Sequence, residues 1–432
     1  MKLGFFLIAA LLQHWLFVSD IHLDPYASGS RIRAYHPGDT AEPLWKSALR
    51  EMRARVPDAR VIVLGGDMLA HDFASLARRN GASPETAAIA TAKGIAAGLA
   101  AAFPRAQFIV ALGNNDDPCG DYRSEIGGSY QNALARVWEP LVDRNGAAPG
   151  FAAQFVRGGY YTVKLPGNER AIVLNSVLWS FVYRGSCSGS ARNPGASELT
   201  WLREQLGRPG SGRDVVVMHI PVGYDALSTT TTHRFLAVPF LNGPADRALL
   251  DMFGDDSRIA FALAAHVHRY AFRIAGDVPM LIGSSISPVY RNNPAFYALE
   301  VDGAGTLHDV VPYVYDLMDG DWHVQPSFDA TYGVDDFTTA NLKAISARIE
   351  RDPSLREKWI EAYDVWSWRM GDIADHRWRV FWCAQTEQNG GYAACAGTQN
   401  RFATVVAVAV VALLVALAGL GVLIRRKFIV RR

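Results

Sequence analysis

The sequence lacks several features that would place it in a class at once. Its 43 basic and 42 acidic residues give a formal net charge of only +1, which excludes a generally basic nucleic-acid binder. It has no internal repeat or low-complexity segment, and half of its residues are hydrophobic, which excludes a disordered chain. With 432 residues the chain can bury a large core, so it needs no disulfide or metal merely to fold.

Cysteine is also scarce. None of the four cysteines has the CxxC spacing of a zinc site. Cys383 and Cys395 lie in a polar, glycine-rich stretch and predict a local disulfide, and Cys119 and Cys187 could form a second one. An even count in an exported chain favours bridges, although spacing alone leaves the connectivity open. The absence of an Asn-x-Ser/Thr sequon favours a bacterial envelope over a eukaryotic secretory pathway.

Two apolar runs stand at the ends of the chain. In residues 1–12, Lys2 precedes about ten apolar residues, and we expect a signal peptide there, with a buried first strand as the alternative. Residues 403–424 carry no charge and precede a basic tail, which predicts one transmembrane helix with residues 425–432 in the cytoplasm. The rest of the chain would then lie in a periplasm, a lumen or the extracellular space.

Between these ends, short apolar runs alternate with polar or glycine residues and with alanine-rich stretches. The runs are rich in Val and Ile and do not alternate strictly, which is typical of strands buried on both faces. The expected strands are 15–18, 61–64, 108–112, 172–174, 215–218, 259–264 and 280–282. With helices expected at 84–102 and 128–142, the pattern predicts a layered α/β catalytic domain over 13–330.

The character of the chain changes near residue 335. Two amphipathic stretches, 337–350 and 354–370, predict helices, and several tryptophans lie near them. We therefore expect a small helical C-terminal subdomain over 331–402.

Polar side chains directly follow five of the expected strands. They are Asp20 and His22; Asp67, with His71 close behind it; Asn114 and Asn115; His219; and His266 and His268. Ligands bind at the carboxyl ends of strands in open α/β sheets, and Asp, His and Asn suit Zn, Mn or Fe. Residues two apart on an extended segment point the same way, so each Asp-x-His or His-x-His pair could face one point. One such histidine alone is more typical of a structural residue, but the ordered set predicts a metal site.

In this order, the motifs Asp-x-His, Gly-Asp, Gly-Asn-x-Asp, His and His-x-His resemble those of the calcineurin-like metallophosphoesterases. Residues 19–26 (SDIHLDPY) and 66–72 (GDMLAHD) resemble the acid-sphingomyelinase-like and endopolyphosphatase branch, and the resemblance covers about residues 15–395. It implies a layered metallophosphoesterase fold with two divalent ions, with zinc preferred and manganese or iron as alternatives. It also implies a metal-bound hydroxide that attacks phosphorus.

The resemblance gives each motif residue an expected role. One metal would be held by Asp20, His22, Asp67 and His268, and the other by Asp67, Asn114, His219 and His266. Asn115 stands where many members have histidine, and its amide can donate to a phosphate oxygen but cannot act as a general acid. His71 is then the expected general acid, a role that contributes typically about 10²–10⁴-fold. Ala265 replaces the glycine that usually precedes the final His-x-His pair.

Other residues are weaker candidates. Asp24 and Asp116 would orient neighbouring ligands. Several more could meet substrate, although core packing, solvent exposure or surface salt bridges are their commoner roles; they are Trp179, Phe181, Tyr183, His233, Arg269 and Arg291.

These expectations describe a membrane-anchored phosphodiesterase that is sphingomyelinase-like and acts on a lipid headgroup or a nucleotide phosphoester. One alternative is endopolyphosphatase or phosphomonoesterase activity on the same centre. The other is an inactive membrane-anchored receptor or scaffold, which only Asn115 favours. Residues 1–12 and 403–432 contain basic residues but no acidic ones. The part of the chain between them, which would be exported, is therefore mildly acidic. That charge disfavours nucleic acid and long polyphosphate and favours a small phosphoester.

Overall fold

The computed structural model describes residues 12–27, 38–167, 169–187, 195–208, 212–231, 236–256, 258–367, 377–388, 390–398 and 404–417. Apart from Leu12, the predicted signal peptide lies outside the described residues, and so does His233.

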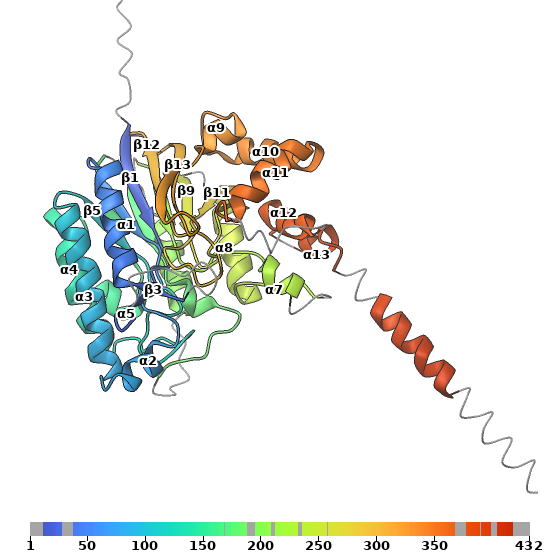
Figure 1. Ribbon diagram of the computed structural model, residues 1–432, viewed down its shortest axis with the longest axis horizontal. Coiled ribbons are helices and arrows are strands. Elements are labelled where there is room, and N and C mark those ends of the chain that lie inside the picture. Colours follow the sequence, from blue (N-terminus) through green and yellow to red (C-terminus); the bar gives the residue numbers. More distant parts are fainter. Residues whose placement is uncertain are drawn as a thin grey trace, which may run out of the picture.

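Two six-stranded sheets form the body of the molecule (Figure 1), in the orders β14-β13-β12-β1-β4-β5 and β10-β11-β9-β8-β7-β6. The first contains β1 (Gln13–Val18), β4 (Val61–Leu64), β5 (Gln107–Val110), β12 (Ala295–Val301), β13 (Leu307–Asp316) and β14 (Asp321–Val324). The second contains β6 (Tyr161–Lys164), β7 (Arg170–Val173), β8 (Asp214–Val217), β9 (Ile259–Ala264), β10 (Ala271–Ala275) and β11 (Val278–Ile282). A separate short pair consists of β2 (Leu23–Asp24) and β3 (Thr40–Ala41).

The two sheets pack face to face. The rings of Trp15 in β1 and Phe261 in β9 lie 5.9 Å apart between centroids. Strands β1, β4 and β5 run parallel, as do β7, β8, β9 and β11. Because both faces of these strands are covered, β4 and β9 are continuous apolar runs without alternation. The predicted layered α/β architecture is therefore confirmed.

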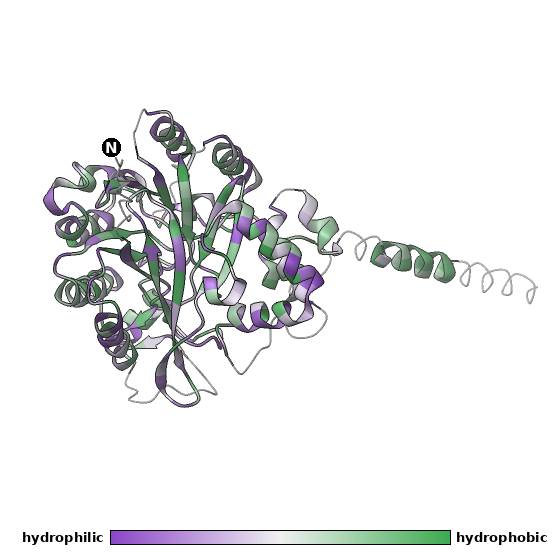
Figure 2. Ribbon diagram, turned by 90° about the horizontal axis from the view of Figure 1, so that it is seen from above, coloured by the Kyte–Doolittle hydropathy of each residue, from purple (hydrophilic) through white to green (hydrophobic). Residues whose placement is uncertain are grey.

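Helices cover the outer faces of the sheets (Figures 1 and 2). They are α1 (Glu42–Arg55), α2 (Phe73–Arg79), α3 (Pro84–Ala102), α4 (Ser129–Val142), α5 (Phe151–Gly158), α6 (Gly195–Leu206), α7 (Ala226–Thr231) and α8 (Gly243–Asp255). Helix α3 forms where the sequence predicts it, because alanine is the strongest helix former and Pro84 is tolerated in the first turn.

A group of short helices follows the last strand (orange to red in Figure 1). It consists of α9 (Phe328–Tyr332), α10 (Thr339–Arg351), α11 (Pro353–Tyr363), α12 (Trp378–Thr386) and α13 (Gly391–Cys395). Helix α11 ends earlier than the predicted 354–370, because Val365 and Trp366 take left-handed φ angles of 56° and 51°. The domain boundary at residue 330 remains a prediction.

The helical group is tied to itself and to the body by specific contacts. The Trp382 indole donates to the carbonyl of Ser346, which joins α12 to α10 (2.9 Å). The rings of Tyr224 and Tyr392 stack at 4.4 Å, which joins α13 to the loop after β8. Two disulfides are present, Cys383–Cys395 in this group and Cys119–Cys187 in the body.

The apolar segment near the C-terminus is described only as a helix over 404–417, which is hydrophobic throughout (Figure 2). Among the described residues, no helix is both long and apolar enough to cross a bilayer. The predicted transmembrane helix over 403–424 is therefore unsupported, and residues 418–432 lie outside the described part.

We predict that replacing Cys383 and Cys395 with alanine lowers the free energy of unfolding by about 2–4 kcal/mol, because the open chain gains entropy when the crosslink is lost. Urea unfolding under non-reducing conditions measures this. Each single variant should lose nearly as much as the double variant, since either substitution removes the bond. An unchanged midpoint in all three variants would show that the crosslink does not stabilise the helical group.

Candidate metal centre

The motif residues are brought together by an unusual backbone. Five of them have left-handed φ angles: Asp20 (47°), His22 (42°), Asp67 (53°), His266 (72°) and His268 (55°). Residues other than glycine seldom adopt this conformation, and each instance costs on the order of 1–3 kcal/mol. The side chains therefore do not converge through extended segments, as the sequence suggested, but through turns that the surrounding fold holds in place.

One cluster is formed by Asp20, His22 and His268, whose ligand atoms lie within 4.8 Å of one another. The Nε2 atoms of His22 and His268 are 3.2 Å apart, and Asp20 Oδ1 lies 3.4 Å from His268 Nε2. The Nδ1 of His22 donates to the carbonyl of Leu69 (3.0 Å), which leaves the Nε2 lone pair directed into the cluster.

A second cluster is formed by Asp67, His219 and His266. His219 donates from Nδ1 to the carbonyl of Gly65 (2.8 Å), so its Nε2 also faces inward, 3.2 Å from Oδ1 of Asn114. The Asp67 carboxylate lies between the two clusters, because its Oδ2 is 3.4 Å from both His219 Nε2 and His22 Nε2.

The donor set fits two divalent cations. Asp20 Oδ1 is buried without a hydrogen-bond partner among the described residues, and burying a carboxylate oxygen without a donor is costly. The Nε2 atoms of His22 and His268 approach to 3.2 Å, a distance that requires a proton or a cation between the two nitrogens. Imidazole nitrogens with carboxylate and amide oxygens suit borderline ions such as zinc.

The pKa values describe a buried centre with a negative potential. Burial lowers the pKa of His22 to about 4, so its ring is neutral near neutral pH. Burial would raise the pKa of Asp20, but the charges of His268 and His219 lower it to about 2. Burial would lower the pKa of His219, but the carboxylates, chiefly that of Asp67, raise it to about 9. The negative potential that raises this pKa is the charge that a bound cation would neutralise.

Two glycines allow the segments around Asp67 to approach one another closely. Gly66 has a φ of +100°, and a Cβ there would collide with the His219 ring and with the backbone of Gly113. A Cβ on Gly113 would meet the carboxylate of Asp67 itself. The glycines that precede Asp67 and Asn114 in the sequence motifs are therefore required by close approach.

Asp116 holds the loop that carries Asp67, in the supporting role that the sequence suggested. Its carboxylate accepts from the backbone N–H groups of Asp67 (2.9 Å), Met68 (2.7 Å) and Gly113 (2.8 Å). Asp24 differs from the expectation, because its carboxylate accepts from the backbone N–H of Tyr26 (2.8 Å) and supports a local turn.

Asn115 also supports Asp67. Its backbone N–H donates to Asp67 Oδ1 (2.7 Å) and its side-chain amide to Oδ2 (2.9 Å). The sequence suggested an amide free to meet a phosphate oxygen, whereas this amide is engaged by the central carboxylate.

No family model matches the chain. A "Sphingomyelinase phosphodiesterase D" from Dictyostelium discoideum is 27% identical over 261 residues, covering 56% of both chains. A cyclic GMP-AMP phosphodiesterase from Homo sapiens is 24% identical over 268 residues, again covering 56% of both. An acid sphingomyelinase-like phosphodiesterase 3b from Mus musculus is 24% identical over 397 residues, covering 81% of this chain and 82% of its own. The chain thus spans about half the length of the first two relatives.

These relatives and the ordered ligand motifs together support the calcineurin-like metallophosphoesterase superfamily, in its acid-sphingomyelinase-like branch. Ala265, where members of this superfamily usually have glycine, lies outside the left-handed region and fits the backbone without strain.

His71 lies beside the metallophosphoesterase centre. Its ring stacks on His22 with centroids 4.1 Å apart, and its Nε2 lies 3.4 Å from the Tyr290 hydroxyl. Its Nδ1 is 2.9 Å from Oδ1 of Asp39. Burial would lower the pKa of His71, but the Asp39 carboxylate outweighs it and raises that pKa. Asp39 and Tyr290 were not identified from the sequence, because no motif marks them.

A cavity of about 260 Å³ opens beside the centre, between the body and the C-terminal helices. Aromatic side chains and one candidate ligand line much of it: Tyr122, Phe240, His266, Tyr290, Tyr363 and Phe381. The structure therefore places a ring-lined space next to the second cluster, and α11 and α12 supply part of its wall.

The other candidates from the sequence have mixed positions. Trp179 is buried in the core and Phe181 is exposed. Tyr183 is partly buried. None of these three aromatic residues lines the cavity. Arg269 is buried, donates to the carbonyl of His268 (3.0 Å) and lies 3.5 Å from Asp364, so it braces the ligand loop. Arg291 is exposed.

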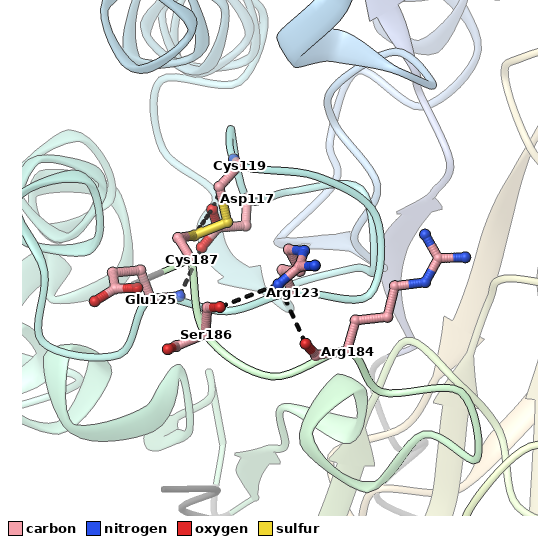
Figure 3. The surroundings of a disulfide bond; sticks show 7 residues. All are labelled: Asp117, Cys119, Arg123, Glu125, Arg184, Ser186 and Cys187. Atoms are coloured by element: carbon pink, nitrogen blue, oxygen red, sulfur yellow. Dashed lines mark hydrogen bonds between the residues drawn. A yellow bond between two sulfur atoms is a disulfide. The ribbon is translucent and has the colours of Figure 1, made fainter. Parts of the chain in front are cut away.

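A disulfide-bonded loop, whose crosslink is drawn in Figure 3, carries the hydrogen-bond partner of the Asn114 amide. The Cys119–Cys187 bond joins this loop to the segment after β7, and Arg123 donates to the carbonyls of Arg184 (3.2 Å) and Ser186 (3.1 Å). The same loop carries Asp121, whose Oδ1 accepts from the Asn114 amide (2.7 Å). That hydrogen bond turns the Asn114 carbonyl oxygen towards His219.

We predict that Asp116→Asn lowers the bound metal content and destabilises the fold by about 1–3 kcal/mol, because an amide cannot satisfy the three N–H groups that Asp116 serves. Metal content is measured by elemental analysis and stability by urea unfolding. Asp24→Asn, the matched control, should retain the parent's metal content. Equal metal content in both variants would contradict the supporting role of Asp116.

Proposed function

We propose that this protein is a binuclear metal-dependent phosphoester hydrolase, and specifically a phosphodiesterase. The observation that carries the proposal is the Asp67 carboxylate, which lies between two clusters of inward-facing ligand atoms. Two relatives are named phosphodiesterases, and their names point to different substrates. What the two names share is the class of reaction, and this supports the same class for this chain.

The ligand chemistry also supports a choice of metal. The first ion would be held by Asp20, His22, Asp67 and His268, and the second by Asp67, Asn114, His219 and His266. Four imidazoles among seven ligands favour zinc, with manganese or iron as alternatives. When bound, two such ions would activate water and stabilise the charge on the phosphoryl oxygens.

The chain's own residues would do the rest of the chemistry. Asp20 and Asp67 supply negative charge that holds the cations, and Asn115 and Asp116 keep Asp67 in place. His71 would donate the proton that the leaving oxygen needs, since its Nε2 lies on the open side of the ring, near Tyr290.

The cavity supports a diester or headgroup substrate. A phosphodiester has a second substituent, and the aromatic space beside His266 would hold it. A lipid headgroup of the sphingomyelin kind and a nucleotide phosphoester both match this description, and both occur in the names of relatives. Endopolyphosphatase or phosphomonoesterase activity on the same centre remains the alternative.

We also propose that the catalytic domain lies outside the cytoplasm. The two disulfides support this, because such bonds persist in oxidising compartments and are rare in the cytosol. The inference rests on the disulfides and not on the predicted membrane helix.

A substrate panel with and without chelator tests the activity. We expect the purified full-length protein to hydrolyse bis-p-nitrophenyl phosphate faster than the mono ester, and chelator to abolish both rates until zinc is restored. ATP, polyphosphate and sphingomyelin separate the substrate classes. Turnover that survives chelation, or none on any phosphoester, would contradict the proposal.

Two substitutions separate metal binding from proton transfer. Asp67→Asn should remove both activity and bound metal, because it takes the shared charge from the centre. His71→Asn should keep the metal content and lose about 10²–10⁴-fold in kcat on a diester with a poor leaving group. Parallel elemental analysis and kinetics measure this, and loss of metal in His71→Asn would assign His71 to the ligand set instead.

A further inference from the structure

We propose that Asp39 is a positioning residue for His71, fixing the orientation and tautomer of the imidazole so that Nε2 faces the leaving oxygen. The inference rests on the proposed function only in that His71 supplies the proton. Asp39 is not a member of any of the sequence motifs, and it lies 32 positions before His71.

The two oxygens of Asp39 hold both the backbone and the ring of His71. Oδ2 accepts from the His71 backbone N–H (2.8 Å), and Oδ1 lies 2.9 Å from Nδ1 of the ring. A carboxylate can only accept, so Nδ1 carries the proton in this contact. Nε2 is then the nitrogen left on the open side of the ring.

The surroundings leave the ring little freedom. One face of the imidazole stacks on His22 with an interplanar angle of 16°, and Tyr290 meets it edge-on at 5.8 Å between centroids. The side chains of His71 and Asp39 are 29% and 12% exposed, so Nε2 remains accessible while the hydrogen-bonded pair is largely shielded from water.

Asp39 is itself anchored to the metal loop. Its Oδ1 accepts from the Ser287 hydroxyl (3.1 Å), and the backbone N–H of Ser287 donates to the carbonyl of Asp20 (3.1 Å). This chain of contacts fixes the His71 ring relative to the first cluster.

Asp39, His71 and His22 are close enough to resemble a third cation site. Both oxygens of Asp39 are already engaged by N–H groups of His71, however, and the His22 Nδ1 is engaged by Leu69. The geometry therefore favours a carboxylate–imidazole pair over a further metal.

The step that this pair serves is a single proton transfer. As the bond between phosphorus and the leaving oxygen breaks, its electron pair stays on that oxygen, which takes the proton from Nε2. The ring starts with a proton on each nitrogen, gives up the one on Nε2, ends neutral and still donates from Nδ1 to Asp39. In Asp39→Asn the amide N–H₂ can face Nδ1 as a donor. This favours the neutral ring with its proton on Nε2 instead of Nδ1, as the same substitution does in the catalytic triad of serine proteases.

The test compares two methyl aryl phosphates on the full-length, metal-loaded protein. p-Nitrophenolate leaves without protonation, whereas phenolate benefits from a proton donor. We expect Asp39→Asn to reduce kcat on the phenyl ester about 10²-fold or more and on the p-nitrophenyl ester by less than about 10-fold. Bound metal should be unchanged, and Asp24→Asn, the same kind of change in a carboxylate that supports a local turn, should show no such difference between the two esters.

Equal losses on both esters, or loss of bound metal, would overturn the proposal and assign Asp39 a structural role. A second measurement does not depend on turnover. In protein labelled with ¹⁵N-histidine, long-range NMR correlations recorded on the neutral ring should place the His71 proton on Nδ1 in the parent and on Nε2 in Asp39→Asn. An unchanged pattern would also overturn the proposal, whereas an inactive parent with the expected shift would refute only the proposed function.

Discussion

The shared position of the Asp67 carboxylate is the constraint on which the rest of the centre depends. It lies 3.4 Å from a histidine nitrogen of each cluster, in a left-handed turn that cannot hold itself. Asp116 binds the backbone of that turn, Asn115 binds the carboxylate, and Gly66 and Gly113 leave the space that it needs. These interactions stabilise a strained geometry that places one carboxylate between two clusters of ligand atoms.

The fold serves this geometry by bringing the carboxyl ends of strands from two sheets to one edge. Asp20, Asp67 and Asn114 follow strands of the first sheet, and His219 and His266 follow strands of the second. The helical group completes the site from the other side, because Tyr363 and Phe381 form a wall of the cavity. The walls of this cavity therefore come from both the sandwich and the helical group.

Much of this was predictable, for physical reasons. Strands β4 and β9 are buried on both faces and so stand out as apolar runs, and α3 stands out through its alanines. The candidate ligands are recognisable because they follow strands in a fixed order. Three features were not predictable, because they depend on contacts between segments far apart in the chain. They are the left-handed turns, the hydrogen bonds of Asn115 to Asp67, and the pairing of Asp39 with His71. Strand β13 was missed because it alternates buried and partly exposed residues and gives no continuous apolar run.

The most direct test of a shared Asp67 is anomalous diffraction from crystals of the metal-loaded protein, collected at the zinc absorption edge. We expect two peaks about 3.5–4 Å apart, with the Asp67 carboxylate between them, one beside His22 and His268 and the other beside His219 and His266. A single peak, or two peaks that do not share Asp67, would contradict the binuclear centre.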